Sequence, residues 1–197
     1  MLYLVTGGSG SGKSGYAEQL AVRLHHSMDE AGKLYYVATM YPYDETETAQ
    51  RIARHRAMRQ GKGFETREQY TDIGCIDPDR RDVLLIECMS NLLANEMYMD
   101  DGSLREIQDI EDLCESAERA IIGPILDMAG SAFAVVVVTN EIFSDGSAEY
   151  CDTETRNYIR LLGYINRRLG MYADETTEVV CGIPVRMKGE RKEESHD

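Results

Sequence analysis

The sequence lacks paired cysteines. Its 197 residues include five cysteines, an odd number, and none of them stands in a C-x-x-C pair. Scattered thiols give neither a disulfide framework nor the ligand spacing of a zinc site. We therefore expect reduced thiols, as in a cytosolic protein. The five are Cys75, Cys88, Cys114, Cys151 and Cys181.

Basic residues are also scarce. Lys and Arg number 21 against 35 Asp and Glu, which gives a net charge of −14. A nucleic-acid binder carries a basic surface, and an anionic membrane attracts clusters of Lys and Arg. The charge therefore argues against polynucleotides and membrane surfaces as partners. It does not argue against a nucleotide, because a phosphate site needs only a local group of donors and cations.

No apolar run in the chain approaches the length of a membrane span. The longest strongly apolar run, Ala132–Val138, is far shorter than the roughly 20 residues that a spanning helix needs. Met1 is followed at once by the strand-like run Leu2–Val5, with no basic segment or cleavage site of a signal peptide. We expect a soluble protein of the cytoplasm.

The chain does contain short apolar runs that alternate with longer stretches in which apolar residues recur every three or four positions. This alternation is typical of the α/β class, in which βαβ units build a mostly parallel sheet with flanking helices. The length suits one domain, which we place at residues 1–188, with a disordered polar tail over 189–197. Strands are predicted at Leu2–Val5, Leu34–Ala38, Val83–Ile86, Phe133–Val138, Glu178–Cys181 and Val185–Lys188, the last two as a hairpin, and helices at Ser14–His26, Thr46–Arg59, Leu104–Met128 and Tyr158–Leu169.

The first predicted strand is followed by the complete phosphate-binding motif G-x-x-x-x-G-K-S/T. In this motif the backbone N–H groups wrap the phosphates, the lysine reaches the β and γ phosphates, and the hydroxyl ligates Mg²⁺. The helix that follows points its N-terminus at the anion. A merely flexible Gly/Ser turn is the alternative, and the position between a strand and a helix argues against it. The loop residues are Gly7, Gly8, Ser9, Gly10, Ser11, Gly12, Lys13 and Ser14.

Polar residues follow two other predicted strands. Glu87 comes directly after Val83–Ile86, at the position where P-loop proteins carry the acidic residue that supports Mg²⁺. Thr139, Asn140 and Glu141 follow the strand Phe133–Val138. In a parallel sheet the carboxyl ends of the strands share one edge, where ligands bind. A helix cap at Glu87 and a loop role for the other three residues remain open.

His55 lies in the most basic stretch of the chain. If this stretch is helical, Arg51, His55 and Arg59 share one face. Neighbouring cations disfavour the imidazolium form, so His55 is expected to stay neutral and nucleophilic near pH 7. The same cations could hold a triphosphate. The spacing alone favours a solvated basic helix face.

The sequence resembles the bifunctional adenosylcobinamide kinase / adenosylcobinamide-phosphate guanylyltransferase family of cobalamin biosynthesis. The likeness runs from Leu2 to Lys188 and rests on several segments that stand in the family's order. They are Val5-Thr6-Gly7-Gly8 with Ser11-Gly12-Lys13-Ser14, Tyr36-Val37-Ala38-Thr39, Arg51-Ile52 with His55, Leu84-Leu85-Ile86-Glu87-Cys88, Val138-Thr139-Asn140-Glu141, Gly163-x-x-Asn166-x-Arg168-Leu169 and Val180-Cys181-Gly182-Ile183-Pro184-Val185.

The resemblance implies a P-loop NTPase domain of the RecA-like kind, assembled as a homotrimer. It implies phosphorylation of adenosylcobinamide by ATP or GTP, followed by transfer of GMP from GTP to adenosylcobinamide phosphate. The second reaction passes through a guanylylated histidine, and by motif that histidine is His55, which replaces the interpretation from spacing alone. A neutral imidazole that attacks the α-phosphate splits one displacement into two.

The resemblance also implies the residues of the site. His55 and Lys13 would be catalytic, and Ser14 and Glu87 would hold Mg²⁺. The nucleotide contacts would be the loop residues 7–14 together with Ala38, Thr39, Met40, Arg56, Ala57, Met58, Arg59, Glu68 and Glu87.

The chain departs from the family's pattern in a few places. Arg54 stands where the family often has a second histidine, and Gly10 where it often has arginine. The stretch Ile142–Ala148 replaces a glycine-rich segment, and Ile159-Arg160 replaces an Arg-Asp pair. Two other functions therefore stay open: a P-loop small-molecule kinase without guanylyltransferase activity, and a non-enzymatic nucleotide-gated regulator.

Overall fold

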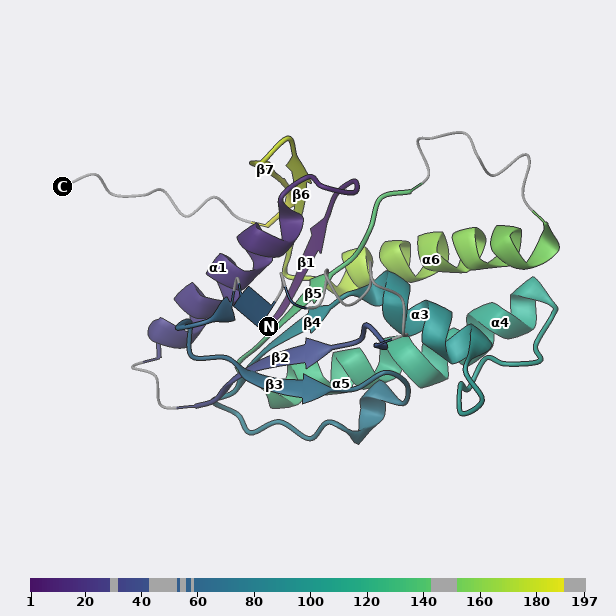
Figure 1. Cartoon of the computed structure of the whole chain (residues 1–197), viewed down its shortest axis with the longest axis horizontal. Coiled ribbons are helices and arrows are strands. Elements are labelled where there is room, and N and C mark those ends of the chain that lie inside the picture. Colours follow the sequence, from purple (N-terminus) through teal and green to yellow (C-terminus); the bar gives the residue numbers. More distant parts are fainter. Residues whose placement is uncertain (29–31, 43–52, 54–55, 58, 143–151, 190–197) are drawn as a thin grey trace.

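The computed structural model of the chain describes residues 1–28, 32–42, 53, 56–57, 59–142 and 152–189. Its centre is one seven-stranded sheet of order β3-β2-β4-β5-β1-β6-β7 (Figure 1). Strands β1 to β6 pair in parallel, and only β7 runs antiparallel, beside β6. The strands are β1 Leu2–Thr6, β2 Leu34–Ala38, β3 Glu65–Glu68, β4 Val83–Glu87, β5 Ala134–Val138, β6 Glu175–Val180 and β7 Ile183–Lys188.

The central strands are buried, and their apolar sequences are the reason that they could be predicted. Every residue of β4 and β5 is buried, as expected of parallel strands covered on both faces. All predicted strands are present, and the hairpin of β6 and β7 is confirmed with both strands longer than expected. Strand β3 was not predicted. Its sequence Glu-Thr-Arg-Glu is exposed throughout and carries no apolar signal, because it is an edge strand.

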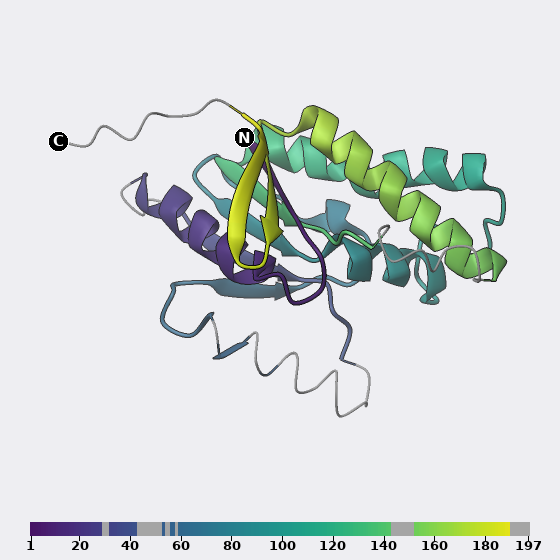
Figure 2. The ribbon, with the colours of Figure 1, turned by 90° about the horizontal axis from the view of Figure 1, so that it is seen from above.

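Helices cover both faces of the sheet (Figure 2). Helix α1 packs on one face through Ala17, Leu20 and Ala21, against Val5 and Leu85 among others. The remaining long helices pack on the other face in a larger apolar core. The helices are α1 Lys13–His26, η1 Ile73–Cys75, α3 Met89–Tyr98, α4 Ile110–Ala117, η2 Glu118–Ile122, α5 Gly123–Ser131 and α6 Thr153–Tyr172. Within the described residues, no helix has the length and apolarity that crossing a membrane requires.

The helix predicted at Leu104–Met128 begins six residues later than expected. Its N-cap is Asp109, whose side chain accepts from the N–H groups of Glu111 at 2.8 Å and Asp112 at 3.2 Å. Leu104 precedes this cap yet is buried, so its apolar character reflects core packing rather than helix. The helical run then continues to Ser131 through the π-helical turn η2, just before Pro124, which offers no backbone N–H.

The strand order positions the candidate site. Strand β5 lies between β1, which precedes the P-loop, and β4, which ends in Glu87. This confirms the RecA-like α/β class that the sequence predicted, with the carboxyl ends of β1, β5, β4 and β2 at one edge. Of the helix predicted at Thr46–Arg59, the structure describes only Ala53, Arg56, Ala57 and Arg59, which are helical. The tail predicted over 189–197 lies outside the described residues except for Gly189.

A buried ion pair ties α1 to the loop that follows Arg59. The Lys62 ammonium donates to Glu18 at 2.6 Å, and the Glu18 side chain is fully buried while that of Lys62 is 33% exposed. The backbone N–H of Lys62 also donates to the carbonyl of Arg59 at 3.1 Å. A carboxylate buried in this way depends on its partner, because an unpaired charge in the interior is costly.

We expect Lys62→Met to destabilise the protein by about 2 kcal/mol, less than the ~3–5 kcal/mol for a fully buried pair, because Lys62 keeps some contact with water. Urea unfolding followed by circular dichroism measures the change. Lys33→Met is the matched control, since the Lys33–Glu65 pair is more than half exposed on both sides, and we expect a change under about 0.5 kcal/mol. Equal effects of the two substitutions would contradict this prediction.

Candidate functional site

The P-loop connects β1 to α1 and folds as a phosphate-binding loop. Gly12 caps α1 in the left-handed conformation, with φ 92°, which a glycine adopts without steric cost. The Lys13 ammonium donates to the carbonyl of Gly8 at 3.0 Å and so lies along the loop. The start of α1 directs its N–H groups toward the same space, which favours an anion.

The β6–β7 hairpin braces this loop from outside (Figure 2). At the hairpin turn the backbone N–H of Gly182 donates to the carbonyl of Ser11 at 2.8 Å. Gly7 lies so close to β6 that a Cβ atom added to it would stand 2.5 Å from the carbonyl oxygen of Val179. Gly7 also has a φ of 153°, which other residues rarely adopt. The loop therefore keeps its shape partly through the last two strands of the chain.

One cleft of about 960 Å³ runs from the P-loop across the carboxyl edge of the sheet. This volume lies within the usual range for small-molecule sites. The cleft brings together side chains from the P-loop, four strand ends and the segment around Arg56. It is lined by residues 9–15 and by Tyr36, Ala38, Met40, Pro42, Arg56, Arg59, Thr66, Glu68, Tyr70, Glu87, Cys88, Asn91, Val138, Asn140 and Ile142.

Glu87 forms the acidic end of β4, and it is 6% exposed. The Tyr36 hydroxyl hydrogen-bonds Glu87, and burial, followed by the charge of Glu87, raises the pKa of Tyr36 far above its usual value. The hydroxyl therefore stays protonated and donates to the carboxylate. Its position makes Glu87 a member of the cleft and not a helix cap, since the cap residue of α3 is Cys88.

Glu68 lies at the opposite end of the cleft, on β3. Its carboxylate accepts from the Arg56 guanidinium at 3.2 Å and from the Tyr70 hydroxyl at 2.9 Å. Burial and the hydrogen bond to Glu68 raise the pKa of Tyr70 to about 12. The Tyr70 ring in turn packs edge-on against Tyr41, with ring centroids 5.0 Å apart. Glu68 thus lines the cleft with two hydrogen-bond partners, although its side chain is 52% exposed.

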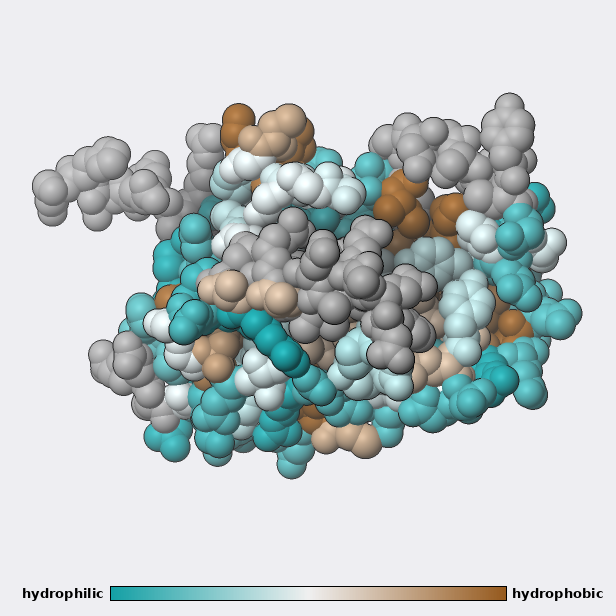
Figure 3. Space-filling model, viewed as in Figure 1, coloured by the Kyte–Doolittle hydropathy of each residue, from teal (hydrophilic) through white to brown (hydrophobic). Residues whose placement is uncertain are grey.

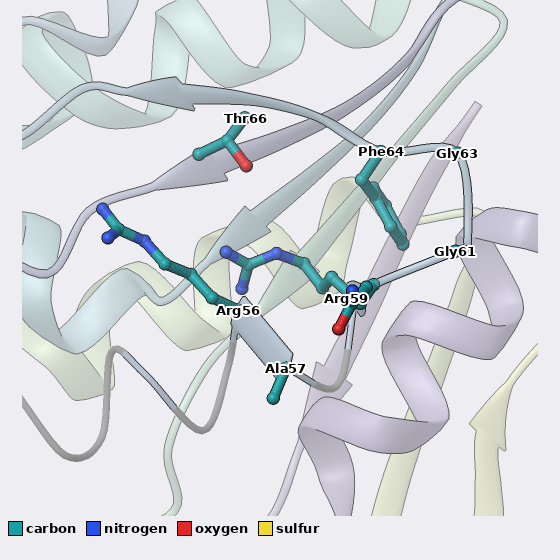
Figure 4. Close-up of a pocket in the computed structure, with 8 residues that line it drawn as sticks. Arg56, Ala57, Arg59, Gly61, Gly63, Phe64 and Thr66 are labelled. Carbon is teal, nitrogen blue, oxygen red and sulfur yellow. The ribbon is translucent and has the colours of Figure 1, made fainter.

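Arg56 and Arg59 supply positive charge to the cleft. Figure 4 shows the two side chains extending in the same direction from their segment, with Thr66 nearby on β3. The Arg59 guanidinium lies 3.4 Å from the ring centroid of Tyr36 and is almost fully buried. A second, shallower hollow of about 410 Å³ adjoins this position and is lined by Arg56, Ala57, Arg59, Gln60, Gly61, Gly63, Phe64 and Thr66.

The Thr-Asn-Glu run after β5 links the cleft to α6. The Thr139 hydroxyl donates to the side-chain oxygen of Asn166 at 2.6 Å, and the Asn166 amide donates to the carbonyl of Asn140 at 3.2 Å. The Asn140 amide donates to the Ser90 hydroxyl at 2.6 Å. Thr139 and Asn166 are therefore cross-links between elements, while Asn140 also lines the cleft. These hydrogen bonds give a structural role to the Thr139-Asn140-Glu141 motif and to the motif that contains Asn166.

The structure gathers most of the predicted site residues that it describes. Thr39 is an exception, because its side chain is buried and its hydroxyl donates to the carbonyl of Cys88 at 2.9 Å. Ala57 lines the shallower hollow, and Gly7 and Gly8 belong to the P-loop but are not among the residues that line the cleft. His55 and Met58 lie outside the described residues.

Sequence reasoning missed several residues of the cleft. Tyr36 entered only as part of a motif, although an aromatic residue on the strand before a polar strand end is a detectable signal. Tyr70 and Asn91 carried no pattern at all, because their role depends on how β3 and α3 reach the cleft.

A divalent cation fits the donor set of this site. Among the described residues no three His, Cys, Asp or Glu side chains gather as a metal site. Ser14 and Glu87 nevertheless line the same cleft beside the P-loop, and one hydroxyl with one carboxylate is the protein share that Mg²⁺ uses with bound phosphates. These two residues are the ones that would hold it.

Comparison with known proteins gives a consistent picture. The family model "Cobinamide kinase / cobinamide phosphate guanyltransferase" matches residues 3–187. The bifunctional adenosylcobalamin biosynthesis protein CobU of Salmonella typhimurium is 32% identical over 196 residues, and that of Escherichia coli is 29% identical over 195. Each match covers 95% of this chain and 100% of the relative. CobP of Pseudomonas aeruginosa is 28% identical over 191 residues, covering 95% and 97%.

A solved structure with a weaker likeness is the flagellar accessory protein FlaH of Methanocaldococcus jannaschii. It aligns with a TM-score of 0.46 and 13% identity, covering 96% of this chain and 78% of that one. A likeness of this size supports no statement about the site.

We expect Gly7→Ala to weaken binding of GTP by about tenfold or more, because the added methyl collides with the Val179 carbonyl and the backbone conformation is strained. Isothermal titration calorimetry measures the change. Gly130→Ala is the matched control, since a Cβ atom at Gly130 on α5 meets nothing within 4 Å. Unchanged affinity in the Gly7 variant would show that the hairpin does not fix the loop.

Proposed function

The chain belongs to the cobinamide kinase / cobinamide phosphate guanyltransferase family, and on this premise we propose that it carries out both reactions. It phosphorylates adenosylcobinamide, and it then transfers GMP from GTP to adenosylcobinamide phosphate to give adenosyl-GDP-cobinamide. The observation that carries the proposal is the family match over nearly the whole chain, together with a cleft that unites the P-loop, two arginines and two carboxylates.

The P-loop holds the triphosphate in this proposal. Lys13 reaches the β and γ phosphates, and the loop N–H groups surround them. Ser14 and Glu87 would hold Mg²⁺, which would neutralise charge on the phosphate oxygens. In the kinase step the side-chain hydroxyl of adenosylcobinamide attacks the γ-phosphorus of ATP or GTP, and the nucleoside diphosphate leaves with the electrons of the broken P–O bond.

His55 is the nucleophile of the guanylyl transfer. The lone pair of its neutral imidazole attacks the α-phosphorus of GTP, an N–P bond forms, and pyrophosphate leaves. The phosphate of adenosylcobinamide phosphate then attacks the same phosphorus, and the imidazole departs with the electrons of the N–P bond. Arg56 and Arg59 come one and four residues after His55, and their charges stabilise the leaving pyrophosphate.

The labelled position of GTP separates the possible functions. With GTP labelled at the α-phosphate and Mg²⁺, we expect an acid-labile, base-stable protein adduct that forms in the parent and is absent from His55→Ala. His26→Ala is the matched control, because His26 is exposed at the end of α1, and it should form the adduct normally.

Two outcomes would replace the proposal. Transfer of label only from the γ-phosphate would indicate a small-molecule kinase without guanylyltransferase activity. Tight binding of GTP with no transfer of either phosphate to protein or corrinoid would indicate a nucleotide-gated regulator.

The proposed assembly is a homotrimer in the cytoplasm. The four described cysteines are free thiols, which suits the reducing cytosol. Strand β7 ends the sheet as an exposed edge, and Figure 3 shows apolar side chains gathered over this hairpin. Exposed apolar residues on an edge strand favour burial against another chain. They are Val180, Ile183, Val185 and Met187, with Met171 and Tyr172 at the end of α6.

We expect the double variant Ile183→Lys/Met187→Glu to sediment as a monomer while the parent sediments as a trimer, because charges on β7 oppose burial of this edge. Analytical ultracentrifugation at several concentrations measures the mass. Tyr98→Lys is the control, since Tyr98 is also an exposed apolar side chain, at 49%, but lies on α3. A monomeric parent would contradict the homotrimer.

A further inference from the structure

Tyr36 is a buried tyrosine whose ring and hydroxyl serve two different residues of the cleft. It lies in the middle of β2, pairs with Thr66 of β3 and Leu85 of β4, and is 4% exposed. Its side chain is on the face covered by α1, where it lines the cleft. Nothing in the proposed chemistry uses it directly, so its two contacts require an explanation.

The Arg59 guanidinium stacks on the ring of Tyr36. The distance of 3.4 Å from the guanidinium carbon to the ring centroid is contact distance, whereas the other five cation–ring pairs among the described residues lie at 4.5–6.0 Å. The face of an aromatic ring attracts a cation, and the attraction is strongest where water is excluded. Phe64 packs edge-on against the same ring and closes this position from one side.

The Arg59 guanidinium contacts the Tyr36 ring, and it forms no ion pair with a carboxylate of the described residues. It is 8% exposed, and its Nη1 atom has no hydrogen-bond partner within the described parts of the chain. Arg56, in contrast, is mostly exposed and is already paired with Glu68. Arg59 nevertheless lines the cleft, and a cation that is already largely removed from water favours an anion in the adjoining space.

The hydroxyl of Tyr36 reaches the other side of the cleft. It hydrogen-bonds Glu87, one of the two residues that would hold Mg²⁺. Since Tyr36 is rigidly packed in the sheet, this bond restricts the directions in which the Glu87 carboxylate can point. One side chain therefore touches both the cationic and the acidic parts of the site.

We propose that Tyr36 is a positioning residue: its ring holds Arg59 in the cleft for the triphosphate, and its hydroxyl orients Glu87 toward Mg²⁺. The inference rests on the proposed function only in taking GTP and Mg²⁺ as the ligands. Tyr36 touches neither reactant itself. Its two parts act on different components, so removal of the ring and removal of the hydroxyl have different consequences.

The neighbouring Tyr35 provides a matched control within the same strand. It is as deeply buried as Tyr36 but faces the opposite core. It also carries an arginine, since the Arg67 guanidinium lies 4.5 Å from its ring centroid and donates to its hydroxyl at 3.4 Å. A Tyr35 variant loses a similar ring and a similar stack, without any contact with the cleft.

The test is equilibrium binding of GTP by isothermal titration calorimetry, in EDTA and in Mg²⁺, with thermal unfolding as a folding control. Tyr36→Met should weaken GTP binding about tenfold, which is the size of a desolvated cation–π contact. Arg59→Ala should weaken it at least as much. In EDTA, where the hydroxyl has no Mg²⁺ ligand to orient, the double variant Tyr36→Met/Arg59→Ala should match Arg59→Ala within about twofold, because the ring acts only through the arginine.

Tyr36→Phe keeps the ring and removes the hydroxyl. It should bind GTP like the parent in EDTA, while the gain in affinity on adding Mg²⁺ should fall about threefold to tenfold, as for one lost hydrogen bond. Tyr35→Met should bind GTP like the parent in both conditions, even where its thermal midpoint falls.

Several results would overturn the inference. Effects of Tyr36→Met and Arg59→Ala that multiply in the double variant in EDTA would show that the ring does not act through Arg59. An unchanged gain from Mg²⁺ in Tyr36→Phe would show that the hydroxyl does not orient Glu87. Should Tyr36→Met not fold, Arg59→Lys replaces it: the proposal expects about tenfold weaker binding, since an ammonium stacks poorly on a ring, and parity with the parent contradicts it.

This binding cycle is distinguishable from the test of the proposed function. If the parent binds GTP but forms no adduct, the proposed guanylyl transfer is wrong, while the binding measurements still test the role of Tyr36. A parent that binds no GTP overturns both.

Discussion

The parallel pairing of β1, β5, β4 and β2 is the constraint on which the rest of the structure depends. Parallel strands end at the same edge, so the residues that follow them are brought together whatever their distance in the sequence. The register pairs Val5 with Val138, and Val138 with Glu87, which places the P-loop, Asn140 and Glu87 around one cleft. The apolar, β-branched sequence of β5 suits this central position, because both of its faces are buried.

The electrostatics of the molecule follow from where its few cations lie. A chain of net charge −14 repels a triphosphate at long range, and the cleft itself contains Glu68 and Glu87. Lys13, Arg56 and Arg59 offset this locally, and each is held differently. Lys13 lies along the P-loop, Arg56 is paired with Glu68, and Arg59 is stacked on Tyr36. Arg59 and Lys13 are each 8% exposed, so water and salt screen their charges less than that of Arg56, whose side chain is 65% exposed.

The sequence predicted the buried central strands and the hairpin, but it did not predict the exposed edge strand β3. The apolar runs at β4 and β5 and the periodicity of α6 indicated their elements, since burial selects for those patterns. Strand β3 has no such pattern. Leu104 was included in a predicted helix because it is apolar, but it precedes the helix and is buried in the core. In the candidate site, the P-loop can be recognised in the sequence because phosphate binding requires glycines at fixed positions. The stacking of Arg59 on Tyr36 could not be predicted from the sequence, because the two residues are brought into contact only by the fold.

The β6–β7 hairpin contacts the P-loop and also carries the exposed apolar residues of the proposed subunit interface. Its turn donates a hydrogen bond to Ser11 and its first strand limits the space around Gly7, so the hairpin determines the shape of the P-loop. Its outer strand also exposes the apolar residues through which we propose that subunits meet. An element that contacts both a ligand site and a subunit interface can couple the two, and any such coupling is reciprocal. The proposed trimer and the bound nucleotide would both contact this hairpin or the loop beside it. The exposed edge of β7 then matters to the chemistry, although none of its side chains lines the cleft.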